Sequence, residues 1–433
     1  MMHKAMNLRF ITVFIARQRD HIREDGWPAL RRKLIILFQI IIRLPLLLLE
    51  LPFAFLIVLV VRLVRPFYVV RFGGLNSWRM GPFAAEIELY LCERDTGINA
   101  PKTNFVDVWY HLNPPCNKQL DLMWRRVLNI GPQHFLNLIV RINAFIPGGD
   151  IHRIGNNTQK DRDVRNLLDR TSPHLKFLLE EERRGQADLR ALGIPPDMPF
   201  VCLIVRDSSY LKKSMPWKSW NYHDYRDCDI QNYILAAQEL ANRGYYVVRM
   251  GAVVKEAMNI VHPMIIDYAT NGVRNDFMDI YLGAKCSFCI SNGTGFDAVP
   301  YIFRRPIVYV DHVPLGLFNT FSSKFLAITK KHWLRDEGRF MTFREIVESG
   351  DSHFCYSNQY EDMGIDLIES IPEEIAAVVL EMESRLKGTW QAADEDEVLQ
   401  RRFWEMFPKG ELHGEIRSRI GVEFLRQNKA WLE

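Results

Sequence analysis

Three short polar segments follow apolar runs in the second half of the chain, and their residue types could bind a phosphate. They are Arg206-Asp207, Arg249-Met250-Gly251 and Ser291-Asn292-Gly293-Thr294-Gly295. Arginine forks make bidentate, charge-assisted contacts with phosphoryl oxygens. Backbone N–H groups of a glycine turn that leads into a helix also favour an anion. We expect Arg206 and Arg249 to hold a diphosphate and to stabilise its charge as it departs, with Asp207 as a third catalytic candidate.

Other residues near these segments are weaker candidates. Gly251 and Asp276 are assigned to the same nucleotide ligand, with Asp276 at its ribose or base. The candidate acid or base groups lie on predicted loops or helix starts, and they are Asp207, His223, Asp224, Asp276 and Asp297. Taken singly, a strand-terminal arginine is often a surface ion pair and a Gly-x-Gly segment is often only a tight turn. The phosphate hypothesis depends on their occurring together.

Familiar phosphate and metal motifs are missing from the sequence. No Gly-Lys-Ser/Thr follows a glycine loop, and Gly293 and Gly295 are followed by Ala298, which disfavours an ATPase and an NAD-dependent dehydrogenase. Cys286 and Cys289 have the spacing of a zinc pair, but three positions apart in a strand they point to opposite faces. Two Asp-x-Asp triplets, 161–163 and 227–229, fall in a helical stretch and before a helix. We expect no metal ion and no cofactor.

Strands and helices that alternate along the chain must position these residues. The expected strands cover residues 67–72, 105–110, 200–205, 245–248, 264–267, 286–290 and 306–311, and the expected helices 81–91, 119–141, 156–192, 230–243 and 275–284. Asp229 is placed to cap the helix 230–243 and Gly244 to end it. Continuous apolar strands indicate a parallel sheet with helices on both faces. In such sheets ligands bind beyond the carboxyl ends of the strands.

The expected architecture is α/β, with two Rossmann-like lobes that face a cleft. Residues 67–195 form the first lobe and 196–385 the second, since Gly193-Ile194-Pro195-Pro196 marks a boundary. An arm of residues 1–66 precedes them, and a helical segment of residues 386–433 follows. The acceptor side of the first lobe is expected where polar and glycine residues follow the opening strand, at Arg71, Gly73, Gly74 and Arg79.

The charge of the chain is distributed unevenly. Its 433 residues are 48% hydrophobic and 25% charged, which excludes a disordered protein. Eleven of the 55 basic and four of the 52 acidic side chains lie in residues 1–70, so that region carries +7 and the remaining 44 basic and 48 acidic side chains carry −4. A nucleic-acid-binding protein would spread basic residues over its folded part. Seven cysteines without framework spacing indicate reduced thiols in the cytoplasm.

The basic arm contains a long apolar segment. Between Leu34 and Val64, 25 of 31 residues are apolar, enough to cross a bilayer. Arg43 and Glu50 interrupt the segment, and Pro45 and Pro52 are expected to break its helix. Basic residues flank both ends, at 31–33 and at 62 and 65, so both ends are expected on the cytoplasmic side. We expect monotopic attachment to the cytoplasmic face of the inner (cell) membrane; a buried helix pair is the alternative.

Several strings together resemble a family of putative bacterial glycosyltransferases that is associated with surface-polysaccharide loci. The resemblance covers about residues 65–390 and is carried by residues 65–73, 88–93, 117–119, 199–207, 244–251, 276–282 and 291–295. It implies a GT-B-type fold, with a nucleotide-sugar in the C-terminal lobe and the acceptor facing the N-terminal lobe. Gly81-Pro82-Phe83-Ala84 departs from the Gly-His-Phe-Ala-like turn of that family. If that histidine serves in the family as a base or an acceptor contact, this chain lacks the role or places it on another residue.

The sequence thus favours a membrane-associated, metal-independent glycosyltransferase. It would transfer a sugar from a nucleotide-diphosphate sugar to a surface glycan, with a lipid-linked glycan as the acceptor that the apolar arm suggests. Two alternatives stay open. One is a nucleotide-sugar epimerase on the same fold, and the other is a non-catalytic membrane scaffold of a polysaccharide-assembly complex.

Overall fold

The computed structural model describes residues 44–155, 161–214, 216 and 219–433, together with residues 27, 31, 34, 35, 38 and 42. The chain forms two compact units. The first comprises residues 1–72, 103–110 and 131–154, and the second residues 73–102, 111–130 and 155–433. The boundary predicted at 195/196 therefore lies inside the second unit, and the region expected to be the first lobe contributes to both units. Arg43 and residues 32–33 lie outside the described residues.

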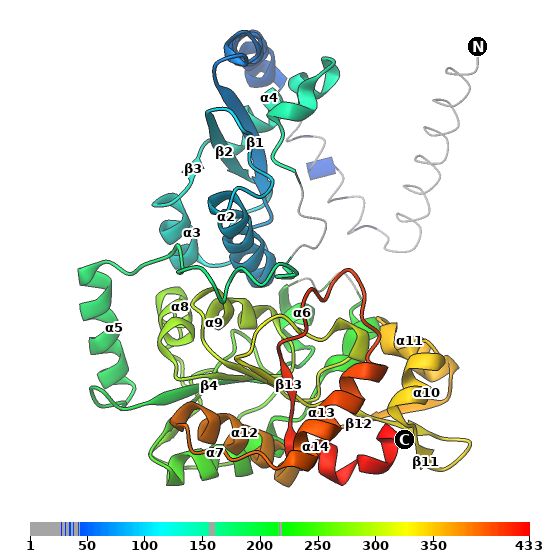
Figure 1. Cartoon of the computed structure of the whole chain (residues 1–433). Helices are drawn as coiled ribbons and strands as arrows, with labels where there is room; N and C mark the ends of the chain where they lie inside the picture. Colours follow the sequence, from blue (N-terminus) through cyan, green and yellow to red (C-terminus); the bar gives the residue numbers. More distant parts are fainter. Residues whose placement is uncertain are drawn as a thin grey trace. The chain divides into compact units, whose positions relative to one another are not determined.

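The second unit is built on a seven-stranded parallel sheet in the order β13-β9-β8-β7-β4-β5-β6 (Figure 1). Starting from β4, the chain adds β5 and β6 on one side and then β7, β8 and β9 on the other. The strand order therefore reverses between β4 and β7, the place where doubly wound sheets bind ligands. The strands are β4 (Phe200–Ile204), β5 (Tyr246–Arg249), β6 (Ile265–Ile266), β7 (Cys289–Ser291), β8 (Ile307–Tyr309), β9 (Phe325–Ala327) and β13 (Arg419–Ile420).

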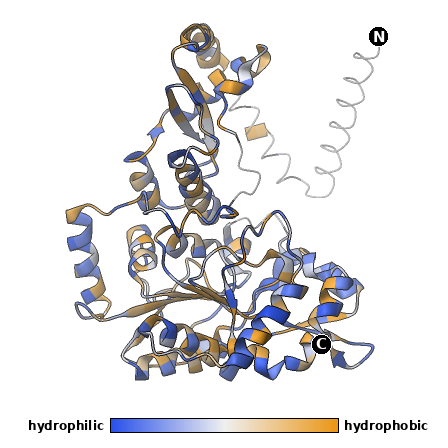
Figure 2. Ribbon diagram, in the orientation of Figure 1, coloured by the Kyte–Doolittle hydropathy of each residue, from blue (hydrophilic) through white to orange (hydrophobic). Residues whose placement is uncertain are grey.

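Helices cover both faces of this sheet, which explains the uninterrupted apolar strands. Figure 1 shows α8 and α9 on one face and α7 and α12 on the other, and each pair is in contact. Val201, Cys202 and Leu203 of β4 are accordingly almost fully buried, and Figure 2 shows the central strands as hydrophobic. The predicted α/β class is confirmed. So are the caps of one helix, because Asp229 Oδ1 accepts from the Gln231 N–H at 2.8 Å and Gly244 has a φ of 87°.

The helices of the second unit deviate from the sequence prediction in two places. Within the described part of the helix expected over 156–192, residues 161–192, helix is present only from Leu179. The helix expected over 119–141 is interrupted between Arg125 and Gln133, where β3 (Asn129–Ile130) lies. A small antiparallel sheet combines β10 (Lys331–Leu334), β11 (Arg339–Phe340) and β12 (Ile365–Ile368). The α-helices are α2 (Ile87–Asp95), α3 (Lys118–Arg125), α5 (Leu179–Ala191), α6 (Ser209–Ser214), α7 (Ile234–Asn242), α8 (Asp276–Lys285), α9 (Ala298–Ile302), α10 (Phe343–Glu348), α11 (Ser357–Asp362), α12 (Pro372–Lys387), α13 (Asp394–Met406) and α14 (Val422–Gln427).

The first unit contains a long apolar helix, Leu44–Val64, together with α4 (Gln133–Phe145). Ala54, Val58 and Val61 recur at helical spacing and pack against Leu136 and Ile139 of α4. Near the C-terminal end of this helix, the guanidinium of Arg62 donates to three carbonyl oxygens at the end of α4 at 2.7–3.0 Å. This contact places a positive charge where the helix dipole is negative.

Two expectations for the N-terminal region change. The break expected at Pro52 is wrong, because the helix Leu44–Val64 continues through that residue. A proline removes a single N–H donor from the ladder, and the remaining bonds of a 21-residue helix maintain it. Where the sequence predicts an N-terminal Rossmann-like lobe, the structure has a three-stranded sheet in the order β1-β2-β3, with β1 at Val69–Leu75 and β2 at Phe105–His111.

Candidate functional site

Asn292 joins the segments that follow β4 and β7, the two strands between which the sheet order reverses. Its Oδ1 accepts from the backbone N–H of Arg206 at 2.9 Å, and its Nδ2 donates to the carbonyl oxygen of Arg226 at 3.0 Å. The Asn292 side chain is buried. The amide is therefore bound to protein backbone rather than offered to a ligand, and it holds both arginines beside the Ser291–Gly295 turn.

Arg206 and Arg226 carry the positive charge at this edge. The guanidinium of Arg226 donates to the carbonyl oxygen of Gly293, and Arg206 Nε lies 3.1 Å from Asp227 Oδ1. Among the described residues, the buried Arg206 Nη2 and Arg226 Nε find no hydrogen-bond partner. Burial and the neighbouring Arg226 both lower the pKa of Arg206. Because a buried donor without an acceptor costs free energy, these N–H groups are suited to an anion.

Several titratable groups surround these arginines. Burial raises the pKa of Asp227 to about 6 even though Arg206 opposes the shift. His312 is buried, and burial, Arg226 and Arg162 lower its pKa to about 3, so its imidazole is neutral at neutral pH. Arg162 donates to Phe318 O at 2.9 Å and adds a third guanidinium near the cluster. The carboxyls of Asp227 and Asp224 also act electrostatically on Arg206.

The glycine turn after β7 is organised by its own side chains. Gly293 N–H donates to Ser291 Oγ at 3.1 Å, Thr294 N–H to Asp297 Oδ2 at 2.9 Å, and Phe296 N–H to Thr294 Oγ1 at 3.2 Å. Ser291 Oγ in turn donates to Asp297, whose pKa burial raises to about 6. These amides are therefore occupied within the turn. The prediction that they cradle a phosphate therefore loses these three N–H donors.

The two glycines of the turn have different surroundings, and backbone conformation and close packing require glycine only at Gly293. Gly293 has a φ of 84°, and a Cβ there would lie 3.1 Å from His312 Cδ2. Gly295 approaches Gly81, since a Cβ on Gly295 would lie 3.4 Å from the Gly81 nitrogen. The glycine segment that precedes α2 and the one that follows β7 are therefore in contact within the second unit.

Arg249 is held by protein partners, and its assignment to the diphosphate stays a prediction that this environment disfavours. This side chain is only 1% exposed, and it donates to Asp267 Oδ2 at 3.0 Å and to the Glu256 carbonyl oxygen at 2.6 Å. It ends β5, one strand away from the reversal between β4 and β7. A charged group this deeply buried needs a charged partner, and Asp267 supplies it, although Arg249 Nε finds no hydrogen-bond partner among the described residues. Arg249 is a structural ion-pair residue.

Three further candidates have structural partners. Asp207 accepts from the Ser209 and Lys255 N–H groups at 2.8 and 2.9 Å, one with each oxygen. Asp276 accepts from the Lys118 N–H at 2.9 Å and so links α8 to α3. Gly251 has a φ of 157°, and a Cβ would lie 2.6 Å from a methyl group of Val254. Both carboxylate oxygens of Asp207 accept backbone N–H groups, so its proposed catalytic role has no free oxygen. The assignment of Gly251 and Asp276 to the nucleotide stays a prediction.

Most residues expected on the acceptor side are structural. Arg71 is buried and forms a bidentate pair with Asp107 at 2.8 and 3.0 Å. Gly73 and Gly74 do not form a loop, because β1 runs through them to Leu75; a Cβ on Gly74 would lie 2.7 Å from Leu112. Arg79 differs. Its guanidinium lies 4.1 Å from the Trp78 ring and 6.0 Å from the Trp220 ring.

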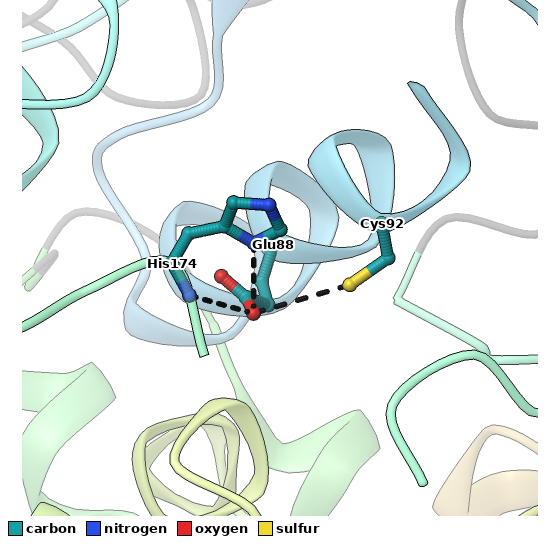
Figure 3. Close-up of side chains that lie close together, drawn as sticks. All are labelled: Glu88, Cys92 and His174. Carbon is teal, nitrogen blue, oxygen red and sulfur yellow. Dashed lines mark hydrogen bonds and ion pairs between the residues drawn. The ribbon is translucent and has the colours of Figure 1, made fainter. Parts of the chain in front are cut away.

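A separate polar cluster, Glu88, Cys92 and His174, has side chains close enough to hold a metal ion (Figure 3). Arg304, however, donates to Glu88 Oε1 at 2.7 Å and to Cys92 Sγ at 3.6 Å. Burial alone would lower the pKa of His174, but hydrogen bonds with Cys92 and Glu88 raise it to about 10. A protonated imidazole cannot ligate a metal, and a guanidinium repels one. The cluster is therefore a buried ion network that ties α2 to the following segments.

A second group of this kind, Cys228, Asp311 and Glu369, is also satisfied by protein. Asp311 Oδ1 accepts from the Ser370 N–H at 2.9 Å and from its hydroxyl at 2.7 Å. Burial raises the pKa of the Cys228 thiol well above its usual range, so the sulfur is not available as a thiolate.

Sequence reasoning missed Arg226, Arg162 and His312. Two of them do not follow a predicted strand: Arg226 lies in a 3₁₀ helix, Asn221–Arg226, and Arg162 in a loop. His312 directly follows the predicted strand 306–311. The segment Tyr222-His223-Asp224-Tyr225-Arg226 contains the candidates His223 and Asp224, and its density of aromatic and charged residues is a sequence signal that points to Arg226.

Comparisons with known proteins give only distant structural likenesses. The sequence matches no protein-family model, and no curated protein matches it. A glycosyltransferase family 9 protein from Veillonella parvula superposes with a TM-score of 0.40 at 12% identity, over 61% of this chain and 86% of that one. ADP-heptose LPS heptosyltransferase II of E. coli gives 0.34 at 15% identity, over 60% and 90%. A putative UDP-N-acetylglucosamine 2-epimerase from Listeria monocytogenes gives a TM-score of 0.29 at 9% identity, over 76% of this chain and 99% of that one.

Proposed function

We propose that the second unit binds a nucleotide-diphosphate sugar and that the protein is a glycosyltransferase. One observation carries the proposal: Arg206 and Arg226 present buried N–H groups without partners among the described residues, at the reversal between β4 and β7. A diphosphate supplies the acceptor oxygens that these donors lack. Two neighbouring guanidinium groups with free N–H donors favour an anion over a neutral ligand.

The two arginines would assist sugar transfer by stabilising the charge that develops on the departing nucleoside diphosphate. Guanidinium groups do here what a divalent cation does in metal-dependent transferases, so the proposed reaction needs no metal. For the base that activates the acceptor hydroxyl, we propose Asp224. Its buried Oδ1 has no partner among the described residues, whereas both oxygens of Asp207 accept backbone N–H groups.

For the location, we propose the cytoplasmic face of a bacterial inner membrane. The supporting feature is the helix Leu44–Val64, which is 21 residues long and apolar. Beyond the stripe that packs on α4, its large side chains are exposed: Leu44, Leu46, Leu47, Leu48, Leu49, Leu51, Phe53, Phe55, Leu56, Leu59, Val60 and Leu63. Because water solvates such a surface poorly, a bilayer is the natural environment. A lipid-linked surface glycan is the acceptor that this location would favour.

A screen of nucleotide-sugars, followed by release of nucleoside diphosphate, tests the proposal on the full chain in detergent or vesicles. Release that depends on a glycan acceptor and disappears in Arg206→Ala and Arg226→Ala supports it. Isomerisation of the sugar without an acceptor would instead identify an epimerase. Failure to bind any nucleoside diphosphate would leave the scaffold interpretation.

A further inference from the structure

Aromatic rings stack beside the arginine cluster. The ring centroids of Trp220 and Tyr222 are 6.0 Å apart with an interplanar angle of 26°, and those of Tyr222 and Tyr356 are 5.7 Å apart at 40°. His223 lies 4.1 Å from Tyr222. The inner ring, Trp220, is buried, and the outer ring, Tyr356, is 50% exposed. We call Trp220, Tyr222, His223 and Tyr356 the aromatic stack.

The aromatic stack is fixed in place relative to the arginines. Tyr222 and His223 belong to the same 3₁₀ helix as Arg226. At about 2.0 Å of rise per residue, Tyr222 and Arg226 are roughly 8 Å apart along that helix. Ser357 holds this helix to the segment that carries Tyr356: its Oγ accepts from the Tyr225 N–H at 3.2 Å and donates to the Asn221 carbonyl oxygen at 2.9 Å.

We propose that the aromatic stack receives the nucleobase of the nucleoside diphosphate, with Tyr356 as the ring on which the base stacks. The inference rests on the proposed function, because the arginines must hold the diphosphate. A purine or pyrimidine has a flat π-face, and stacking on an aromatic side chain contributes about 1–3 kcal/mol per base. Rings that are already ordered lose little conformational entropy on binding. Asp224 lies on the same helix, so base and diphosphate would flank a candidate catalytic carboxylate.

The neighbouring Cys355 offers an independent readout. Its thiol is partly accessible and donates to the His353 carbonyl oxygen at 3.4 Å. A base stacked on Tyr356 should slow alkylation of the adjacent thiol. Inorganic pyrophosphate, which has no base, should protect it much less.

Calorimetric titration with pyrophosphate, ADP, GDP, UDP and CDP distinguishes binding of the base at Tyr356 from binding of the diphosphate at the arginines. If the inference is correct, Tyr356→Ala weakens binding of at least one nucleoside diphosphate by about 5- to 150-fold. Pyrophosphate binding stays unchanged, and Tyr356→Phe retains nucleotide affinity because the ring remains. Tyr68→Ala is the matched control, since Tyr68 is also an exposed tyrosine but belongs to the first unit.

Two outcomes would overturn the inference, and they differ from failure of the proposed function. If nucleoside diphosphates bind in an arginine-dependent manner but Tyr356→Ala binds them as tightly as the wild type, the stack does not hold the base. Equal losses of pyrophosphate and nucleotide affinity in Tyr356→Ala would show a structural effect instead. If the wild type binds neither pyrophosphate nor any nucleotide, the proposed function itself fails.

Discussion

The guanidinium of Arg226 donates to the carbonyl oxygen of Gly293, so a residue between β4 and α7 is anchored on the turn that follows β7. Asn292, next along that turn, holds the backbone of both Arg206 and Arg226. Neither β4 nor β7 alone would form an anion site. The proposed site depends on the reversal of the sheet order between these two strands, which brings their following segments together.

Gly293→Ala should destabilise the protein and weaken diphosphate binding. The substitution strains a φ of 84° and brings a methyl group to 3.1 Å from His312; strain of this kind costs about 1–3 kcal/mol. Gly272→Ala is the control, because Gly272 has a φ of 81° but nothing within 4 Å of a Cβ. Urea unfolding of both variants gives the free energies of unfolding. Equal losses in the two would mean that the His312 contact is unimportant.

Arg249→Met should reduce stability more than it affects the ligand site. Removing one partner of a buried ion pair costs about 3–5 kcal/mol because the other charge, here Asp267, is left unpaired. The double variant Arg249→Met/Asp267→Asn should recover part of this loss. At temperatures where the variant remains folded, its affinity for pyrophosphate should be close to that of the wild type. A selective loss of affinity without a loss of stability would restore the original assignment of Arg249.

The ion network around Glu88 should make stability depend on pH through His174. The folded-state pKa of His174 is raised to about 10, above its unfolded value of about 6.5. Its stabilising contribution is therefore complete below about pH 6.5 and declines as the pH rises towards about 10. The difference in unfolding free energy between the wild type and His174→Gln should shrink over that range. A difference that stays constant or grows with pH would contradict the assignment of a charged His174.

The exposed side of the helix Leu44–Val64 should control membrane association. Leu48 and Leu56 are 63% and 58% exposed and lie off the stripe that packs on α4. Placing Lys at one of these positions costs about 2.5–3.5 kcal/mol if it must enter the bilayer core. Leu48→Lys/Leu56→Lys should therefore shift the protein from the membrane fraction to the soluble fraction in vesicle flotation. Leu386→Lys, on α12 of the second unit, serves as the control and should not shift it.

The sequence was sufficient to predict the parallel sheet, but not the direction of the side chains that follow its strands. Arg206 and Arg249 have the same signature, an arginine at the end of an apolar strand. Only the strand order shows that the first stands at the reversal and the second beside it. The partner of Arg249, Asp267, follows another strand 18 positions later, and nothing local marks the pair.

Glycines and the missed arginine illustrate the same limit. The pair Gly73-Gly74 suggests a loop, yet both residues lie within β1. Glycine is needed at position 74 because Leu112 packs where a side chain would be. Such a contact is a property of the tertiary structure. Arg226 lies in a 3₁₀ helix between two longer elements, so neither strand nor helix periodicity predicts its direction.

The most direct test of the account is calorimetric titration of pyrophosphate and of nucleoside diphosphates into the wild type, Arg206→Ala and Arg226→Ala. Each arginine makes charge-assisted contacts worth about 1.5–3 kcal/mol, so each variant should bind about 10- to 150-fold more weakly. The control Arg243→Ala removes an exposed guanidinium that pairs with Glu239 on the same helix and should bind normally. Wild-type affinity in both Arg206→Ala and Arg226→Ala would contradict the central claim.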